Sequence, residues 1–461
     1  MRHASKAALV AAVATAALSL PLPRAAAIPF PPPLGPCGGP DCPSSWNPPN
    51  NEGFAGRDTN INIFAGGNYT VSGRAAEAEG WVVALGDLTV DKNGGGSFNM
   101  GVVGVGSRVP PPNGHDFVTV GGNVTSQTGN NLIVGGPDSP PTSIAYGNLR
   151  YGGALGGAGT ITVEPTGQKI HDTTVKDTYG PLRTTIEEFS SCAARQTATG
   201  TVAVTNSEAT FTGDGTSARQ VFNVSQNLTS GSGGQIGLVF ANIPAGATVV
   251  VNMLGDSPTI NTYSGTGDNS DPLTGLRPRL MWNFPTATSG TVTGTGQFQG
   301  SVMAGNAAGT TTLSTAGVNG RVYLAGNLLQ TSGGGGYELH AYPFDGDLPD
   351  CGSTPTPTPT PTASPTTSPS PSESASTSPS PSSSPSPSTS GSPSTSPTTG
   401  PTASHSGSGS ASASDSESGS LPNTGSSGTS GLLGTAGALL IAGAGALLFG
   451  RRLSRRRGRH S

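Results

Sequence analysis

The stretch QFQGSVMAGN, residues 297–306, is followed 20 positions later by a related stretch, GVNGRVYLAGN, residues 317–327. In the first, a glycine precedes apolar side chains at alternate positions, Val302 and Ala304, and in the second Val322 and Leu324 occupy the same places. An earlier segment, EGWVVALGDLTV, repeats the Gly-x-Val-x-Ala spacing. A repeat of about 20 residues with short strands and glycine turns is what a β-solenoid requires.

This repeat predicts the fold class. Alternate residues of each strand would point into a narrow core, and glycines would form the corners. We therefore expect a domain dominated by β-structure, a right-handed β-solenoid or β-helix-like stack. A sandwich of short strands would show the same alternation and remains the alternative.

One segment departs from the strand pattern and predicts a helix. Its apolar residues step by four, three, four and three positions, which places them on one helical face: Val175, Tyr179, Leu182, Ile186 and Phe189. We expect Gly180-Pro181 to divide this helix and Gly200 to follow its end. An apolar stripe of this kind suits one helix that covers the strands.

The carboxyl end combines a pentapeptide, an apolar run and basic residues. The pentapeptide LPNTG consists of Leu421, Pro422, Asn423, Thr424 and Gly425. Residues 431–449 carry no charge and are just long enough to span a membrane, and six arginines follow them. In this order the three parts resemble the sorting signal of Gram-positive surface proteins. The resemblance implies cleavage by a sortase after Thr424 and covalent linkage of Thr424 to peptidoglycan.

Composition divides the rest of the chain. Residues 1–27 have the basic start, apolar run and small residues of a signal peptide, and residues 28–60 form a Pro/Gly-rich leader. We place the β domain at 61–350, and a disordered stalk of Ser, Thr and Pro at 351–420, before the sorting signal at 421–461 with its transmembrane helix. The mature chain would be secreted, held at the cell wall and exposed on the extracellular surface.

Charge and cysteine content narrow the function. Without its two ends the chain has a net charge of about −13, which argues against nucleic acid as a partner. The four cysteines, Cys37, Cys42, Cys192 and Cys351, lie in an oxidising compartment and are disulfide candidates. Three pairings are possible; one joins Cys37 to Cys42 and leaves Cys192 for Cys351. No Cys-x-x-C pair supports zinc, and the scattered aspartates of GDNSD and DGDLPD fit solvated turns better than calcium, so we predict no metal site.

Several motifs resemble one family. NIFAGGNYT from Asn62, VTVGGNVT, YGNLRYGG and the closing GYELHAYPFDGDLP are similar to the choice-of-anchor A domain of secreted bacterial surface proteins. Together with the sorting signal, this resemblance implies an actinobacterial surface protein with an adhesive β-rich domain and no established catalytic residues. The part from MWNF onward also resembles the solenoids of ice-binding proteins, which carry a helix alongside.

Catalytic motifs are scarce. Three histidines, His115, His171 and His340, are spread over the β domain, and neither H-E-x-x-H nor G-x-S-x-G occurs. We therefore predict a non-enzymatic protein without a cofactor.

The predicted function is that of an adhesin that binds an extracellular polymer, protein or glycan, without turnover. Ice adhesion is an alternative favoured by Thr310, Thr311 and Thr312, although the sequence lacks T-x-T ranks at the coil period. A structural wall role and, last, a polysaccharide-active enzyme are further alternatives.

Overall fold

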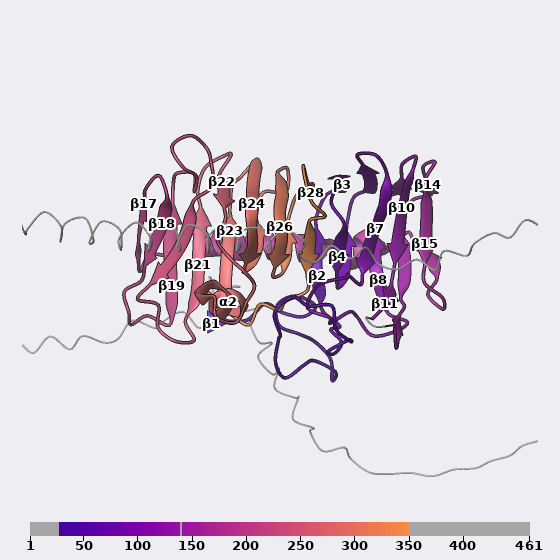
Figure 1. Cartoon of the computed structure of the whole chain (residues 1–461), viewed down its shortest axis with the longest axis horizontal. Coiled ribbons are helices and arrows are strands. Elements are labelled where there is room, and N and C mark those ends of the chain that lie inside the picture. Colours follow the sequence, from indigo (N-terminus) through magenta and orange to yellow (C-terminus); the bar gives the residue numbers. More distant parts are fainter. Residues whose placement is uncertain (1–26, 139–140, 350–461) are drawn as a thin grey trace, which may run out of the picture. The chain divides into compact units, whose positions relative to one another are not determined.

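The computed structural model describes residues 27–138 and 141–349. Residues 1–26 of the predicted signal peptide, Cys351, the predicted stalk and the whole sorting signal lie outside these residues. The described part consists mainly of short parallel strands that curl around a common core, with few helices (Figure 1). None of its helices is both long and apolar enough to cross a membrane.

One sheet runs the length of the strand stack and is here named face 1. In the described chain it contains ten strands: β16 (Lys169–His171), β13 (Asn148–Tyr151), β8 (Asp116–Val120), β5 (Trp81–Ala84), β2 (Ile61–Ala65), β27 (Val322–Leu324), β25 (Ser301–Ala304), β23 (Leu280–Phe284), β21 (Thr248–Met253) and β19 (Arg219–Val224). Its strands β2, β21 and β23 are largely apolar and buried on both sides, whereas β13 and β16 at one end are polar and partly exposed.

A second sheet, of 13 strands in the described chain, forms two further faces. Face 2 contains β14 (Leu155–Gly156), β9 (Val124–Ser126), β6 (Leu88–Lys92), β3 (Tyr69–Gly73), β28 (Asn327–Gln330), β26 (Thr310–Asn319), β24 (Ser289–Gln299) and β22 (Thr259–Thr262). Face 3 contains β15 (Thr160–Val163), β10 (Asn130–Val134), β7 (Gly96–Gly101), β4 (Glu77–Glu79) and β29 (Glu338–His340), together with the ends of β26 and β24. The long strands β24 and β26 join the two faces.

Small elements complete the unit. At one end of the stack, β17 (Thr201–Val204), β18 (Glu208–Thr212) and β20 (Gly237–Ala241) form a three-stranded sheet. The helix α2 (Pro272–Leu276) and the 3-10 helix η1 (Arg277–Arg279) lie in a long loop. Two short pairs are β11 (Gly136–Pro137) with β12 (Ile144–Ala145), and β1 (Ala27–Ile28) with β30 (Leu348–Pro349).

The register confirms the 20-residue repeat. In β25 and β27, Val302 lies opposite Val322 and Ala304 opposite Leu324. The related segment in β5 is one coil further away, because β2 lies between β27 and β5. The apolar residues that alternate in these strands therefore stack on one another inside the three faces.

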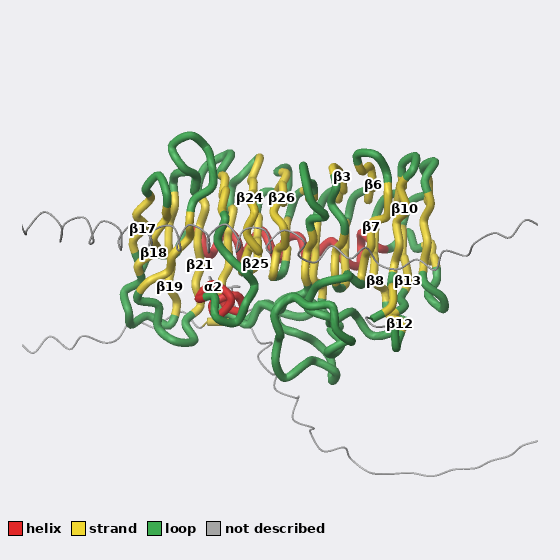
Figure 2. The backbone as a smooth tube through the Cα atoms, in the orientation of Figure 1, coloured by secondary structure: helices red, strands yellow, loops and turns green. Residues whose placement is uncertain are grey.

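The chain builds this stack from the middle outwards. From β2 it adds coils in one direction as far as β16, the helix α1 (Val175–Ala194) follows, and the chain then builds back from β19 to β27. The first strand of face 1, β2, consequently pairs with the last, β27. Figure 2 shows the long red helix running across the strands that it connects.

The helix covers the outer side of face 1, as predicted, but it is not divided. Pro181 lies inside the single helix, and the helix ends at Ala194, well before Gly200. Ile186 and Ala193 are buried against outward-facing side chains of face 1, among them Met303. Packing along the whole apolar stripe compensates for the hydrogen bond that the proline cannot donate.

The Pro/Gly-rich leader, residues 28–60, contributes side chains to the folded core. Phe30 is 1% exposed and its ring lies 4.6 Å from that of Phe189 in α1 and 5.2 Å from that of Tyr323 in β27. Asp58 forms a buried ion pair with Arg321, at 2.6 Å. Apolar residues and a paired charge thus attach this Pro/Gly-rich segment to the last coil.

Candidate binding face

On face 2, outward side chains reach solvent in every strand from β22 to β14. In β3, buried and half-exposed residues alternate, and β26 and β24 show similar alternation over their first residues. On face 1, α1 and residues near Phe30 cover the outer side, and on face 3 the residues of β4 and β29 are buried, so that outward side chains reach solvent there only in the strands toward β15. Face 2 is therefore the broad sheet surface open to a partner. Figure 1 labels β22, β24, β26, β28 and β3 along this side of the stack.

Threonines form a rank across this face. In each coil, one residue of the face 2 strand lies directly opposite its counterpart in the next coil. The side chains of all these residues are half-exposed. In stacking order the rank is Thr259, Thr291, Thr312, Leu329, Thr70, Thr89 and Thr125. We call it the threonine rank. The rank is one threonine wide and Leu329 interrupts it, so T-x-T pairs do not repeat from coil to coil, as the sequence indicates.

A second row of polar residues runs beside the threonine rank, two positions further along the strands. Asn261, Thr293 and Ser314 are in register, and Ser72 lies opposite Asp91. The Ser72 hydroxyl donates to that of Thr331 at 2.9 Å. With strands about 4.8 Å apart and alternate residues about 6.7 Å apart, the two rows form a regular array of hydrogen-bonding groups.

Coil length explains why the sequence hides the threonine rank. The step from Thr70 to Thr89 is 19 residues, whereas the step from Thr89 to Thr125 is 36. Loops of different length inserted at the corners change the sequence spacing and leave the strand register intact. A search at one fixed period therefore fails, although the T-x-T pattern at Thr291 and Thr293 is a local signal of the face.

A ladder of Asn and Asp side chains fixes the corner from which face 2 begins. The side-chain oxygen of Asn327 accepts from the Asn68 amide at 2.8 Å, that of Asn68 from the Asp87 amide at 2.8 Å, and that of Asp87 from the Asn123 amide at 2.7 Å. The Gly-Gly-Asn motifs occur here because a Cβ at Gly66 would lie 2.2 Å from the carbonyl oxygen of Ala325. The corner is thus rigid, and the array on face 2 is held in place before any partner binds.

The structure brings together an acidic cluster on face 3 that the sequence reasoning missed. Glu77, Glu79, Glu338 and His340 are all nearly or fully buried. Burial, reinforced by the charge of Glu338, raises the pKa of Glu77 to about 8. Glu79 accepts backbone N–H groups of Ser107, Arg108 and Ala341. The alternating acids of AEAEG were the available signal. Because the cluster is closed to solvent, it serves the fold and offers no access to a substrate.

The remaining candidate residues lie apart from the threonine rank. His171 lies in β16 beside the ring of Tyr151, and His340 belongs to the buried cluster. His115 lines a pocket of about 210 Å³ with Trp81 and Tyr179. The carboxylates of Asp268 and Asp271 accept N–H groups of their own turns.

The two cysteines near the amino end form a disulfide, Cys37–Cys42. Their sulfur atoms lie near the carboxylate of Asp58, and this is the group closest to a metal-ligand arrangement among the described residues. Both sulfurs belong to the disulfide, so they are not available as thiolate ligands.

Comparison with known proteins gives two family matches. Residues 55–339 match the model of a family described as "Putative Ice-binding-like adhesive domain". Residues 413–457 match the model of the LPXTG cell wall anchor motif. No curated protein and no solved structure matches the chain.

Proposed function

The chain belongs to the family of ice-binding-like adhesive domains, and from this premise we propose that its threonine rank binds a regularly repeating extracellular polymer without turnover. The LPXTG anchor makes the chain a cell-wall-anchored surface protein of the adhesin type, processed by a sortase and attached to peptidoglycan. The observation that carries the proposal is the register of the rank across seven strands.

The chemistry of the face suits a repeating ligand. Each hydroxyl can donate one hydrogen bond and accept others, and each exposed bond contributes only about 1 kcal/mol. Such weak contacts gain strength when a partner repeats at the spacing of the strands, and again when many copies are held on one cell. Both a protein fibre and a glycan chain present groups at regular intervals. The buried acids and dispersed histidines supply no group in reach of a ligand on this face, which favours binding without cleavage.

A substitution in the middle of the rank tests the proposal. Thr312→Lys should weaken binding of the full mature chain to its polymer by at least about tenfold, because a long charged side chain prevents close contact along the face. Thr162→Lys changes an exposed threonine of β15 on face 3 and is the matched control. Binding is measured on an array of glycans and matrix proteins with multimerised protein, beside a product assay.

Three results would contradict the proposal. These are equal binding by the Thr312→Lys variant and the natural chain, equal loss in both variants, and cleavage of a bound ligand. The absence of any ligand on the array would favour a structural role in the wall.

Ice is a second candidate, favoured by the two parallel rows of hydroxyl and amide groups and by the family description. A flat, regular array is the geometry that an ordered water lattice would match. Shaping of growing ice crystals by the purified chain, lost in Thr312→Lys and kept in Thr162→Lys, would select this candidate over a polymer.

We further infer the finer features of the chain from its sequence. The stacked coils form a right-handed β-solenoid, the family resemblance extends to choice-of-anchor A proteins of actinobacteria, and Thr424 is the residue joined to peptidoglycan. Residues 1–27 act as the signal peptide, and residues 431–449 span the membrane in the precursor. The motif order and the polar stalk support these inferences.

A further inference from the structure

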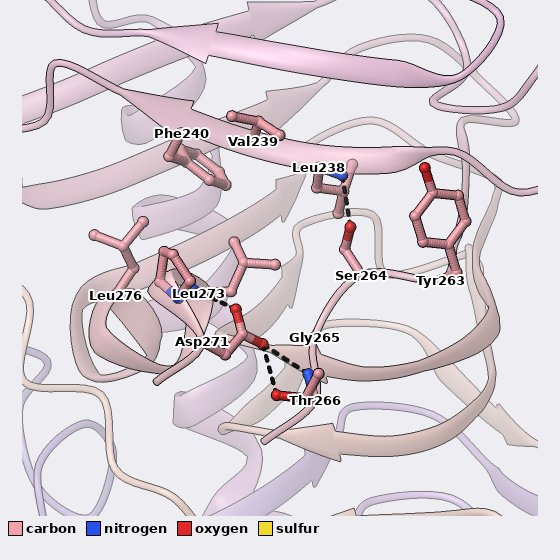
Figure 3. A pocket seen from close by; sticks show the side chains of 11 residues that line it. Leu238, Val239, Phe240, Tyr263, Ser264, Gly265, Thr266, Asp271, Leu273 and Leu276 are labelled. Carbon is pink, nitrogen blue, oxygen red and sulfur yellow. Dashed lines mark hydrogen bonds between the residues drawn. The ribbon is translucent and has the colours of Figure 1, made fainter. Parts of the chain in front are cut away.

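A pocket of about 330 Å³ opens near the end of the stack where β17, β18 and β20 lie. Its walls come from β20, from the turn after β22 and from α2 (Figure 3). The turn and α2 belong to the loop inserted before β23, so this pocket is an addition to the repeating coil. Its lining residues lie outside the threonine rank.

One part of the pocket is apolar. Phe240, Leu273 and Leu276 form a recess; Val239 projects from the other side of β20, and Tyr263 lines the pocket beyond Leu238 and Ser264 (Figure 3). Tyr263 is 54% exposed and Val239 39%; apart from Ile144, they are the large apolar side chains exposed in the described chain. The Tyr263 hydroxyl donates to the Ser207 carbonyl at 3.1 Å, which holds the ring in position. The apolar recess and the exposed ring of Tyr263 give the pocket the apolar surface that is typical of ligand sites.

The other part of the pocket is polar. The Asp271 carboxylate accepts the Leu273 amide at 3.0 Å and the Thr266 amide at 2.6 Å, and it keeps further lone pairs. Ser264 Oγ accepts the Leu238 amide at 2.7 Å, which leaves its own O–H free to donate. Figure 3 shows these polar groups beside the recess. A ligand with hydroxyls on one side and an apolar group on the other would fill both parts.

We propose that this pocket binds one pyranose ring that carries a methyl group, as an N-acetyl or a 6-deoxy sugar does. The methyl group enters the recess of Phe240, Leu273 and Leu276, and the ring packs against Tyr263. Sugar hydroxyls donate to Asp271 and accept from Ser264. An unsubstituted hexose would bury a hydroxyl in the recess without a partner, which is unfavourable. An apolar peptide side chain would leave the Asp271 side of the pocket unused.

This inference rests on the proposed adhesin function and names a glycan as one of its ligands. The test is to titrate the full mature chain with free N-acetylglucosamine, fucose or glucose and to measure the affinity for each sugar by NMR. The first, the second or both should bind, and glucose should bind at least about tenfold more weakly. Tyr263→Ala should weaken sugar binding about tenfold, whereas Tyr263→Phe should stay within about twofold because the ring remains.

Ile144→Ala removes the other exposed apolar side chain and should leave sugar binding unchanged. Leu276→Trp should fill the recess and abolish sugar binding. An unfolding temperature close to that of the natural chain would show that this variant is folded. Equal affinity for glucose, no effect of Tyr263→Ala, or binding of N-acetylphenylalanine amide in place of all sugars would overturn the proposal. Thr312→Lys should bind the free sugars normally, so a failure of the threonine rank and a failure of this pocket give different results.

Discussion

At the scale of single residues, Glu77 shows how a polar strand residue becomes part of the fold. One of its carboxyl oxygens accepts from the Asn99 side-chain amide at 2.8 Å, and the other from the Gly104 amide at 2.7 Å. The site is fully buried, and the desolvation of the carboxylate, more than the nearby charge of Glu338, raises the pKa to about 8. In the folded chain, Glu77 therefore stays protonated between about pH 4.5 and pH 8, where an exposed glutamate would be ionised.

This shift predicts a stability that falls as pH rises. Between the ordinary carboxyl pKa, about 4.3, and the raised one, the folded state binds a proton that the unfolded state has lost. The free energy of unfolding should therefore be a few kcal/mol lower at pH 8 than at pH 5, since one pKa unit corresponds to about 1.4 kcal/mol. Glu77→Gln, which stays neutral, should remove most of this dependence in denaturant titrations.

Glu188→Gln is the control for this prediction, because Glu188 is exposed on α1 and should leave the pH dependence as it is. An unchanged dependence in Glu77→Gln would show that other groups determine it.

At the scale of elements, the helix α1 connects the two halves of the stack. Near its carboxyl end, Cys192 is 3% exposed and its Sγ lies 3.2 Å from the carbonyl oxygen of Pro349 in β30. No cysteine among the described residues is free, and Cys37 is already paired with Cys42. Cys351 lies outside the described residues, two positions beyond Pro349. We therefore predict a Cys192–Cys351 disulfide that ties the helix to the start of the stalk.

Peptide mapping by mass spectrometry without reduction should find Cys192 and Cys351 in one linked peptide. Cys37–Cys42 serves as the internal control in the same digest. Cys192→Ser should lower the free energy of unfolding by roughly 2–5 kcal/mol, because the crosslink closes a long loop. Thiols at both positions that react with an alkylating agent would contradict the pairing.

At the scale of the whole molecule, the proposed binding face and the anchor belong to different parts of the chain. The threonine rank lies between residues 70 and 329, and the pentapeptide LPNTG follows the Ser/Thr/Pro segment.

Thr424→Ala should leave the protein in membrane and medium fractions, because the sortase loses the residue whose carbonyl it transfers. Fractionation of cells with a wall-degrading enzyme measures this. The control is Thr429→Ala, just beyond the pentapeptide, which should be anchored normally. Release of the Thr424→Ala protein by that enzyme alone would show that another residue is attached.

The sequence alone determined the features that depend on near neighbours. The alternation in QFQGSVMAGN predicts strands stacked at a 20-residue step, and the spacing of Val175, Tyr179 and Ile186 predicts the covering helix. The pentapeptide, read with its flanks, predicts the wall anchor that the family match supports. These features can be recognised in the sequence because strand alternation, helical period and a cleavage motif each depend on residues close together in the chain.

Only the tertiary structure decided which coils are neighbours. β2 pairs with β27 across some 260 residues of chain, and the accompanying pairing of β3 with β28 unites the threonines of both halves into one rank. Corner loops of unequal length make the sequence spacing irregular, so strand register alone reveals the rank. Likewise, packing on face 1 keeps α1 continuous through Pro181, and the insertion that contains α2 completes the pocket at Tyr263. In each case the stabilising contacts join segments that are distant in sequence, so no local sequence pattern predicts them.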